Sequence, residues 1–165
     1  MGKISIITIC FNSGKTIFKT LESVKKQSFS NIEHIIIDGA SNDKTLEICK
    51  EYSNSIKIIS EQDNGVYDAF NKGLKLATGD VIGFLNADDT FYNENSIQDI
   101  VDAFSNNETD IVYGNLDYVN KEGKVIRNWI SRPYEKGLVK KAWMPAHPTF
   151  YCKKEVYDRL GGYND

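Results

Sequence analysis

The stretch Lys3-Ile-Ser-Ile-Ile-Thr8 decides the fold class, because it is rich in β-branched residues and almost wholly apolar. A strand with one face in water alternates apolar and polar residues, whereas a strand covered on both faces is apolar nearly throughout. We therefore expect residues 3–8 to form a strand of a sheet that is covered on both faces.

Similar apolar strands and helical stripes alternate through the first 85 residues. Further strands are expected at 32–37, 56–59 and 80–85, with amphipathic helices between them. The apolar stripes of these helices are Ile17, Phe18, Leu21 and Val24; Leu46, Cys49 and Tyr52; and Val66, Phe70, Leu74 and Ala77. Asn12 or Ser13 is the expected cap of the first helix. The alternation predicts βαβ units in a parallel sheet, whose ligand sites lie at the carboxyl ends of the strands.

Beyond Asp89 the alternation gives way to shorter elements. A helix is expected around 97–104, a short strand at 111–113, a hairpin from 116–119 and 124–128, and a last helix at 153–160. We therefore expect residues 1–165 to form one α/β domain, in which a mostly parallel central sheet has flanking helices and a small antiparallel addition.

The composition excludes several classes of protein. The chain has 20 Lys+Arg against 23 Asp+Glu, a net charge of -3, so no nucleic-acid partner is expected. Its longest apolar stretches are far shorter than the roughly 20 residues that span a bilayer. The 3 cysteines lack CxxC spacing, which is typical of the reducing cytosol. Because Met1 leads directly into a strand, no secretory signal is expected, and we predict a cytoplasmic protein.

Acidic residues follow three of the predicted strands. Asp38 ends the second strand, Asp63 follows the third, and Asp88-Asp89 follow the fourth. Turn chemistry alone accounts for single Asp residues at such places. Two adjacent carboxylates repel each other unless a cation joins them. Oxygen ligands without nearby Cys or His favour Mg2+ or Mn2+, held jointly with the phosphates of a ligand.

Two common nucleotide-binding motifs are incomplete. Residues 12–16 (Asn-Ser-Gly-Lys-Thr) are similar to the end of a P-loop, but Ile9 stands where that loop needs a glycine. No GxGxxG follows the first strand, which disfavours a nicotinamide cofactor. His34 lies within a strand and is expected to be structural. His147 lies in a proline-rich loop, where packing and a role in the site are both open.

Several segments, in this order along the chain, carry a family resemblance: Ser5–Asn12, Asp38–Asp43, Glu61–Gly73, Gly79–Asp89, Ala146–Phe150 and Gly161–Asp165. Together they resemble the amino-terminal, nucleotide-sugar-binding portion of a family 2 glycosyltransferase of the bacterial cell-surface polysaccharide type. The resemblance implies a Rossmann-like GT-A fold with a nucleotide-binding half at 1–89 and the start of the acceptor half at 90–165. It also implies a His-containing strand at 146–150.

The resemblance implies nucleotide contacts at the ends of the first three strands. Phe11, where the family commonly has Tyr, would stack on the base. Asp38 would accept a hydrogen bond from the ring N–H of the base, as expected for uracil. Asn12 and Asp63 stand where further contacts to the nucleotide or the sugar are made.

For the fourth strand, the resemblance implies a DxD-type metal motif. Asp88 would contact the ribose and help to bind the metal, and Asp89 would ligate Mg2+ or Mn2+ directly. Asn86 takes a place often held by Asp, which removes one negative charge. Asn71 and Lys72 either face the diphosphate or are ordinary surface residues of a helix.

The activity implied by the resemblance is inverting transfer of a sugar from a UDP-sugar to a saccharide or lipid-linked acceptor. The family supplies its general base beyond the turn at 161–165, so a chain truncated at its C-terminus is expected. His147 and Asp165 are the candidates for a base within the chain. A lipid-linked acceptor would bring the protein to the inner face of the cell membrane. The alternatives are a nucleotide-sugar-binding or assembly module without transfer, and a nucleotidyltransferase.

Overall fold

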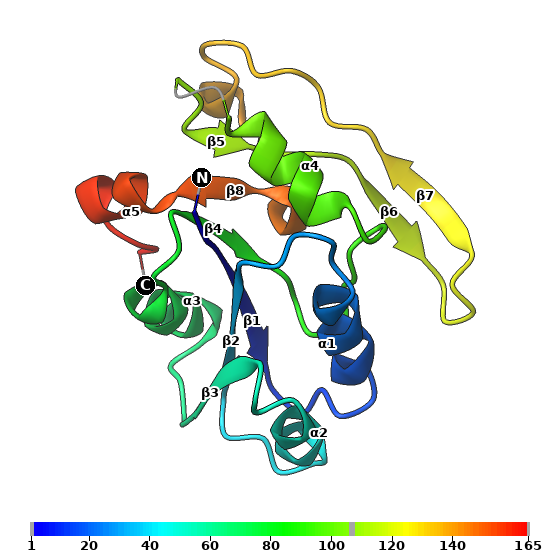
Figure 1. Ribbon diagram of the computed structural model, residues 1–165. Coiled ribbons are helices and arrows are strands. Elements are labelled where there is room, and N and C mark those ends of the chain that lie inside the picture. Colours follow the sequence, from blue (N-terminus) through cyan, green and yellow to red (C-terminus); the bar gives the residue numbers. More distant parts are fainter. Residues whose placement is uncertain (1, 106–107, 165) are drawn as a thin grey trace.

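The computed structural model, which describes residues 2–105 and 108–164, has a six-stranded central sheet with the order β3-β2-β1-β4-β8-β5 (Figure 1). Its parallel strands are β1 (Ile4–Cys10), β2 (Ile32–Asp38), β3 (Ile56–Ser60) and β4 (Val81–Phe84). Strand β8 (Tyr151–Lys153) runs antiparallel between β4 and β5 (Ile111–Val112). The predicted α/β class with a mostly parallel central sheet is confirmed.

Helices cover both faces of this sheet (Figure 1). One face carries α1 (Ile17–Lys25), α2 (Thr45–Glu51) and α4 (Ser96–Ala103), and the other carries α3 (Val66–Leu76) and α5 (Lys154–Leu160). Within β1, Ile6 packs toward α1 and α4, whereas Ile7 packs toward Phe70 of α3. Because successive side chains of a strand point to opposite faces, this double cover explains the apolar run in β1.

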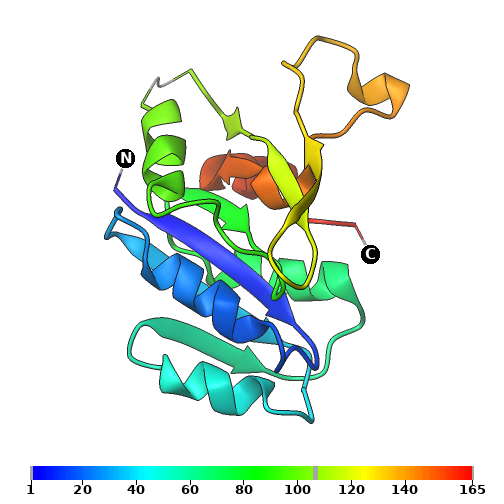
Figure 2. The same cartoon turned by 90° about the vertical axis from the view of Figure 1, so that its right-hand side faces the viewer.

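Helices α1 and α2 lie side by side on their face of the sheet (Figure 2). The rings of Phe18 and Tyr52 meet edge to face with centroids 6.5 Å apart. The Tyr52 hydroxyl donates a hydrogen bond to Glu22 Oε1 at 2.7 Å. These contacts join the two crossover helices that follow β1 and β2.

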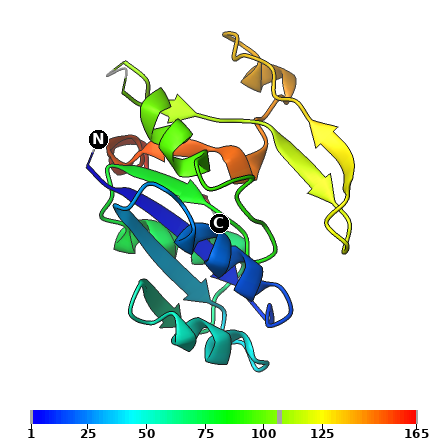
Figure 3. The same ribbon diagram turned by 45° about the vertical axis from the view of Figure 1, so that its right-hand side comes forward.

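The predicted hairpin is also confirmed, as a separate two-stranded sheet of β6 (Leu116–Val119) and β7 (Val125–Trp129) (Figure 3). The Arg127 guanidinium lies over the rings of Tyr118 and Trp129, at 5.4 and 5.9 Å from their centroids. Two 3-10 turns, η1 (Val139–Lys141) and η2 (His147–Thr149), follow it along the chain. In the described part of the chain, no helix is long and apolar enough to cross a membrane.

Two local predictions are wrong. The expected His-containing strand at 146–150 is mostly a 3-10 turn, and strand pairing begins only at Tyr151. Pro148 lies within this turn and lacks the amide proton that a ladder requires. Neither Asn12 nor Ser13 caps α1 through its side chain, since Thr16 occupies the cap position and Asn12 bonds to another loop.

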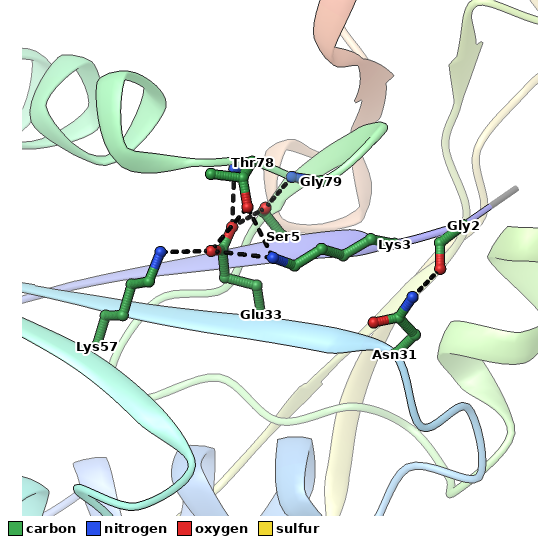
Figure 4. A network of polar contacts seen from close by, with 8 residues as sticks. All are labelled: Gly2, Lys3, Ser5, Asn31, Glu33, Lys57, Thr78 and Gly79. Atoms are coloured by element: carbon green, nitrogen blue, oxygen red, sulfur yellow. Dashed lines mark hydrogen bonds and ion pairs between the residues drawn. The ribbon is translucent and has the colours of Figure 1, made fainter.

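A buried carboxylate ties the amino-terminal ends of the strands together (Figure 4). Glu33 of β2 accepts hydrogen bonds from Ser5 Oγ at 2.7 Å, Lys57 Nζ at 2.6 Å and the Thr78 amide at 2.8 Å. Burial raises the pKa of Glu33, but the hydrogen bonds outweigh this effect and hold the pKa well below its ordinary value. The network joins β1, β2, β3 and the segment before β4 at the edge opposite to the strand-end carboxylates.

Candidate active site

The carboxyl ends of β1, β2 and β3 meet in register, with Cys10 beside Asp38 and Asp38 beside Ser60. Asp38 is fully buried, with 0% exposure. Its Oδ2 accepts hydrogen bonds from the Ser41 amide at 3.0 Å and the Ser60 hydroxyl at 2.7 Å, and its Oδ1 accepts one from the Ser41 hydroxyl at 2.5 Å. Asp38 therefore holds the turn that follows β2.

The loops after β1 and β2 are bonded to each other. The Asn12 amide donates to Ser41 Oγ at 2.8 Å, and Asn12 Oδ1 accepts from the Asn42 amide at 3.0 Å. Asn12 and Ala40 both adopt left-handed backbone conformations, with φ of 51° and 62°. Such conformations are costly for residues with a Cβ, so the bonds between the loops hold a strained arrangement at the strand ends.

An open aromatic face lies beside a carboxylate at this edge. The Phe11 ring is 62% exposed, and Asp63 is half-buried. A Cβ placed on Gly39 would lie 2.6 Å from Asp63 Oδ2 and 3.5 Å from Phe11 Cδ2. The absence of a side chain at Gly39 therefore lets the Asp63 carboxylate lie close against the backbone, beside the exposed Phe11 side chain. This Phe11 face, formed by Phe11, Gly39 and Asp63, suits a flat heterocycle that can both stack and donate a hydrogen bond.

The two adjacent carboxylates follow β4 in a turn that packs on α1. Thr20 of α1 donates to the Asp89 carbonyl at 2.8 Å, and Asn86 Nδ2 donates to Asp89 Oδ2 at 2.9 Å. Asp88 is exposed and Asp89 is half-buried. Burial raises the pKa of Asp89 and the Asp88 charge adds to this, whereas the Asn86 hydrogen bond and His147 oppose it. The pair therefore brings two carboxylates together at the end of β4.

A divalent cation fits this pair of residues. Carboxylate oxygens are the ligands that Mg2+ and Mn2+ prefer, and a cation would oppose the effects of burial and of the Asp88 charge, which raise the pKa of Asp89. Among the described residues, no group of three or more His, Cys, Asp or Glu side chains is arranged to hold a metal. A cation at Asp88 and Asp89 would therefore need further oxygen ligands from a bound phosphate compound.

His147 lies on an aromatic cluster near Asp89. Its ring centroid is 5.3 Å from that of Phe70, 6.1 Å from Phe84 and 6.5 Å from Tyr163. This packing lowers the pKa of His147, although the charge of Asp89 acts in the opposite direction. His147 therefore packs on the aromatic cluster and also interacts with the charge of Asp89, so both roles left open by the sequence remain open. The other candidate base, Asp165, lies outside the described residues.

Asn71 and Lys72 both have partners within the protein. Asn71 Nδ2 donates to the Tyr163 carbonyl at 2.9 Å, and the Tyr163 amide donates to Asn71 Oδ1 at 2.8 Å. Lys72 Nζ lies 3.0 Å from Glu61 Oε1 and 3.3 Å from Asp68 Oδ2. A contact of either side chain with a diphosphate would compete with these bonds.

Sequence reasoning missed Ser60 and Tyr163. Ser60 is the last residue of β3 and lies in register with Asp38, so aligning the ends of the predicted parallel strands would have found it. Tyr163 stacks on Tyr67 with centroids 5.7 Å apart and ring planes at 12°. Its tie to Asn71 spans 92 positions, and no local pattern signals a contact of that range.

The sequence model of "Glycosyl transferase family 2" matches residues 5–159. The chain is 33% identical over 117 residues to a PGL/p-HBAD biosynthesis glycosyltransferase of Mycobacterium bovis (strain BCG / Pasteur 1173P2), covering 68% of this chain and 46% of that protein. It is 29% identical to the poly(ribitol-phosphate) β-N-acetylglucosaminyltransferase TarP of Staphylococcus aureus (strain N315), covering 96% of this chain and 51% of TarP. The chain thus spans about half the length of these relatives.

Solved structures share the fold. A Pyrobaculum calidifontis mannosyltransferase in complex with GDP-Man and Mn2+ superimposes with a TM-score of 0.76 at 18% identity, covering 98% of this chain and 47% of that one. S. aureus TarS 1–349 in complex with UDP-GlcNAc superimposes with a TM-score of 0.75 at 22% identity, covering 95% of this chain and 47% of the TarS chain. These neighbours confirm the expected GT-A type of fold.

Proposed function

Because the chain belongs to glycosyl transferase family 2, we propose that it transfers a sugar from a nucleotide sugar, and that the nucleotide is UDP. The observation that carries this proposal is the exposed Phe11 side chain beside the Asp63 carboxylate, which packs on Gly39. This Phe11 face lies at the carboxyl edge of the parallel strands, where α/β sheets bind their ligands. TarS, which shares the fold, has been solved with UDP-GlcNAc.

In this proposal the base stacks on the exposed ring of Phe11 and donates a ring N–H toward a carboxylate. Asp63 Oδ2 lies against Gly39, beside the Phe11 ring. Asp38 is fully buried, and its oxygens already accept hydrogen bonds from Ser41 and Ser60. Rotation of the Ser60 hydroxyl would free one site on Asp38 for the base. Asn12 contributes by holding the loop after β2.

Asp88 and Asp89 would hold Mg2+ or Mn2+ together with the donor diphosphate. When bound, the cation would stabilise the charge that develops on the leaving diphosphate. Asn86 orients Asp89 through its amide at 2.9 Å, and Thr20 fixes the backbone of the same residue. Asp88, the more exposed of the pair, would contact the ribose as well. Asn71 and Lys72 would reach the diphosphate only by releasing their partners in the protein.

The acceptor is proposed to be a saccharide or a lipid-linked compound, and transfer to invert the configuration of the sugar. A lipid-linked acceptor would bring the protein to the inner face of the membrane. Inversion requires a general base near the incoming hydroxyl. His147 is placed near Asp89, and its lowered pKa keeps the imidazole neutral and able to accept a proton at neutral pH.

A thermal-shift screen followed by a UDP-release assay tests this proposal. Nucleotides and nucleotide sugars are added with and without Mn2+, because a ligand that binds only the folded chain raises its melting temperature. We expect UDP and one or more UDP-sugars to stabilise the chain more when Mn2+ is present. A larger rise in melting temperature with GDP than with UDP would mean that the nucleotide is GDP. No rise with any nucleotide would overturn the proposal. Binding without UDP release in the presence of acceptors would favour the binding module.

A further inference from the structure

A mostly apolar cavity of about 300 Å³ lies beside the aromatic cluster at His147. It is lined by the side chains of Met144, Pro145, His147, Phe150, Tyr157 and Tyr163. A cavity of roughly 150 Å³ with apolar walls holds benzene in another protein, so this space accommodates an aryl ring. Rings and a thioether are also the side chains that favour contact with an aromatic group.

The cavity adjoins the proposed reaction centre through His147. The ring of His147 lines the cavity, and its centroid is 6.1 Å from that of Phe84, the last residue of β4. Asp88 and Asp89 follow the same strand. A group bound in the cavity would therefore lie beside the end of β4 without using the Phe11 face at Gly39 and Asp63.

Asn71 of α3 fixes one wall of this cavity. Its amide forms the two hydrogen bonds to the backbone of Tyr163, at 2.9 and 2.8 Å. A Cβ on the neighbouring Gly162 would lie 2.2 Å from Asn71 Oδ1, so the amide and the turn are packed directly together. The Tyr163 ring is held in turn by Tyr67 and by Phe70, whose centroid is 5.1 Å away. Both hydrogen-bonding ends of Asn71 are used for this purpose.

We propose that this cavity is the subsite for an apolar, aryl-type group of the acceptor, and that Asn71 is a positioning residue that builds it by holding Tyr163. The inference rests on the proposed function, because it assigns the cavity to the acceptor side of that transfer. A second cavity of about 430 Å³ shares Tyr157 and Tyr163, and it is lined also by Asn71, Lys75, Lys154 and Asp158. Its charged lining makes it the poorer site for an aryl group.

The test measures the binding of phenyl β-D-glucopyranoside and methyl β-D-glucopyranoside by chemical-shift titration, with UDP titrated separately. Burial of the phenyl ring should make the phenyl glycoside bind about tenfold more tightly than the methyl glycoside. Met144 is 74% exposed, so Met144→Gln should weaken phenyl glycoside binding without disturbing the fold. Lys75→Ala, which alters only the larger cavity on the same helix as Asn71, is the matched control and should have no effect.

Asn71→Leu removes both hydrogen bonds to Tyr163 at similar volume. We expect about fivefold weaker binding of the phenyl glycoside and unchanged affinity for UDP. Asn71→Asp keeps the acceptor for the Tyr163 amide and should give an intermediate loss. Equal binding of the two glycosides, insensitivity to Met144→Gln, or a loss with Lys75→Ala would overturn the inference. Failure of UDP to bind the unaltered chain would instead count against the proposed function alone.

Discussion

Ser41 donates two hydrogen bonds to Asp38, one from its amide at 3.0 Å and one from its hydroxyl at 2.5 Å. A third donor, the Ser60 hydroxyl, reaches the same carboxylate from β3 at 2.7 Å. The carboxylate is fully buried and thus acts as the acceptor around which the turn at 38–43 is built. This structural role is separate from any contact with a nucleotide, and the two roles predict different results on mutation.

Asp38→Asn should destabilise the protein as well as weaken UDP binding. The new amide group would face the Ser41 amide or the Ser60 hydroxyl with a donor instead of an acceptor, which should lower the free energy of unfolding by about 2 kcal/mol. Asp63→Asn, at a half-buried site, should change stability by less than about 0.5 kcal/mol but also weaken UDP binding. Urea unfolding and calorimetry on both variants check this. Equal stability of the two variants would contradict the buried role of Asp38.

Glu33→Gln should lower the free energy of unfolding by about 2 kcal/mol at pH 7, because Lys57 and Lys3 would lose a charged partner whose carboxylate is nearly buried. Exposed Glu51→Gln is the matched control. Since the pKa of folded Glu33 is held below its ordinary value of 4.5, its contribution is present above that pH and is lost as the pH falls below it. Urea unfolding from pH 3 to 7 should therefore show the variant converging on the wild type toward acid. A difference independent of pH would contradict the charge network.

Tyr151→Phe should raise stability. Tyr151 is 2% exposed, and its hydroxyl has no hydrogen-bond partner among the described residues. Removal of an unpaired buried hydroxyl should increase the free energy of unfolding by about 0.5–1 kcal/mol. Tyr52→Phe removes a hydroxyl that is bonded to Glu22 and should have the opposite effect. A loss of stability in Tyr151→Phe, measured by thermal unfolding, would mean that the hydroxyl is satisfied in solution.

Asp89→Asn should remove most of the effect of Mn2+ on UDP binding. The substitution deletes a charge while keeping the shape, and we expect a loss of about tenfold or more in UDP affinity at saturating Mn2+. Asp99→Asn, on the exposed side of α4, serves as the control. Chelation should weaken UDP binding to the wild type but leave Asp89→Asn nearly unchanged. Unaltered dependence on Mn2+ in Asp89→Asn would show that the cation binds elsewhere.

The parallel part of the fold and the positions of the strand-end acids were predictable from local patterns. Apolar runs such as 32–37 indicate doubly covered strands, and parallel order brings Asp38 and Asp88 to one edge. Strand β8 was less predictable than the other elements after β4, because it has only 3 residues and pairs with a strand about 70 positions earlier. The segment before β8 is a 3-10 turn, which contains Pro148.

The hydrogen-bond partners of the site residues could not be predicted from the sequence either. Asn71 has the spacing of a helix surface residue, yet its bonds to Tyr163 make it part of a tertiary contact. Asn12 has a side chain of the type that caps helices, but its side-chain oxygen Oδ1 accepts a hydrogen bond from the Asn42 amide instead. In both cases a polar side chain can bond to a local or to a distant partner. Which of the two it bonds to depends on the packing of the whole chain.

The central claim, that the Phe11 face binds the base of UDP, is tested most directly by calorimetric titration of UDP into the wild type, Phe11→Ala and Phe18→Ala at saturating Mn2+. Phe18 is a matched control, since it is 52% exposed but lies on α1 outside the Phe11 face. Loss of a stacking ring costs about 1–3 kcal/mol per base. We therefore predict that Phe11→Ala weakens UDP binding by about tenfold, that Phe18→Ala leaves it unchanged, and that ADP binds the wild type more weakly than UDP. Equal affinities of UDP for the two variants, or ADP binding as tightly as UDP, would contradict the account.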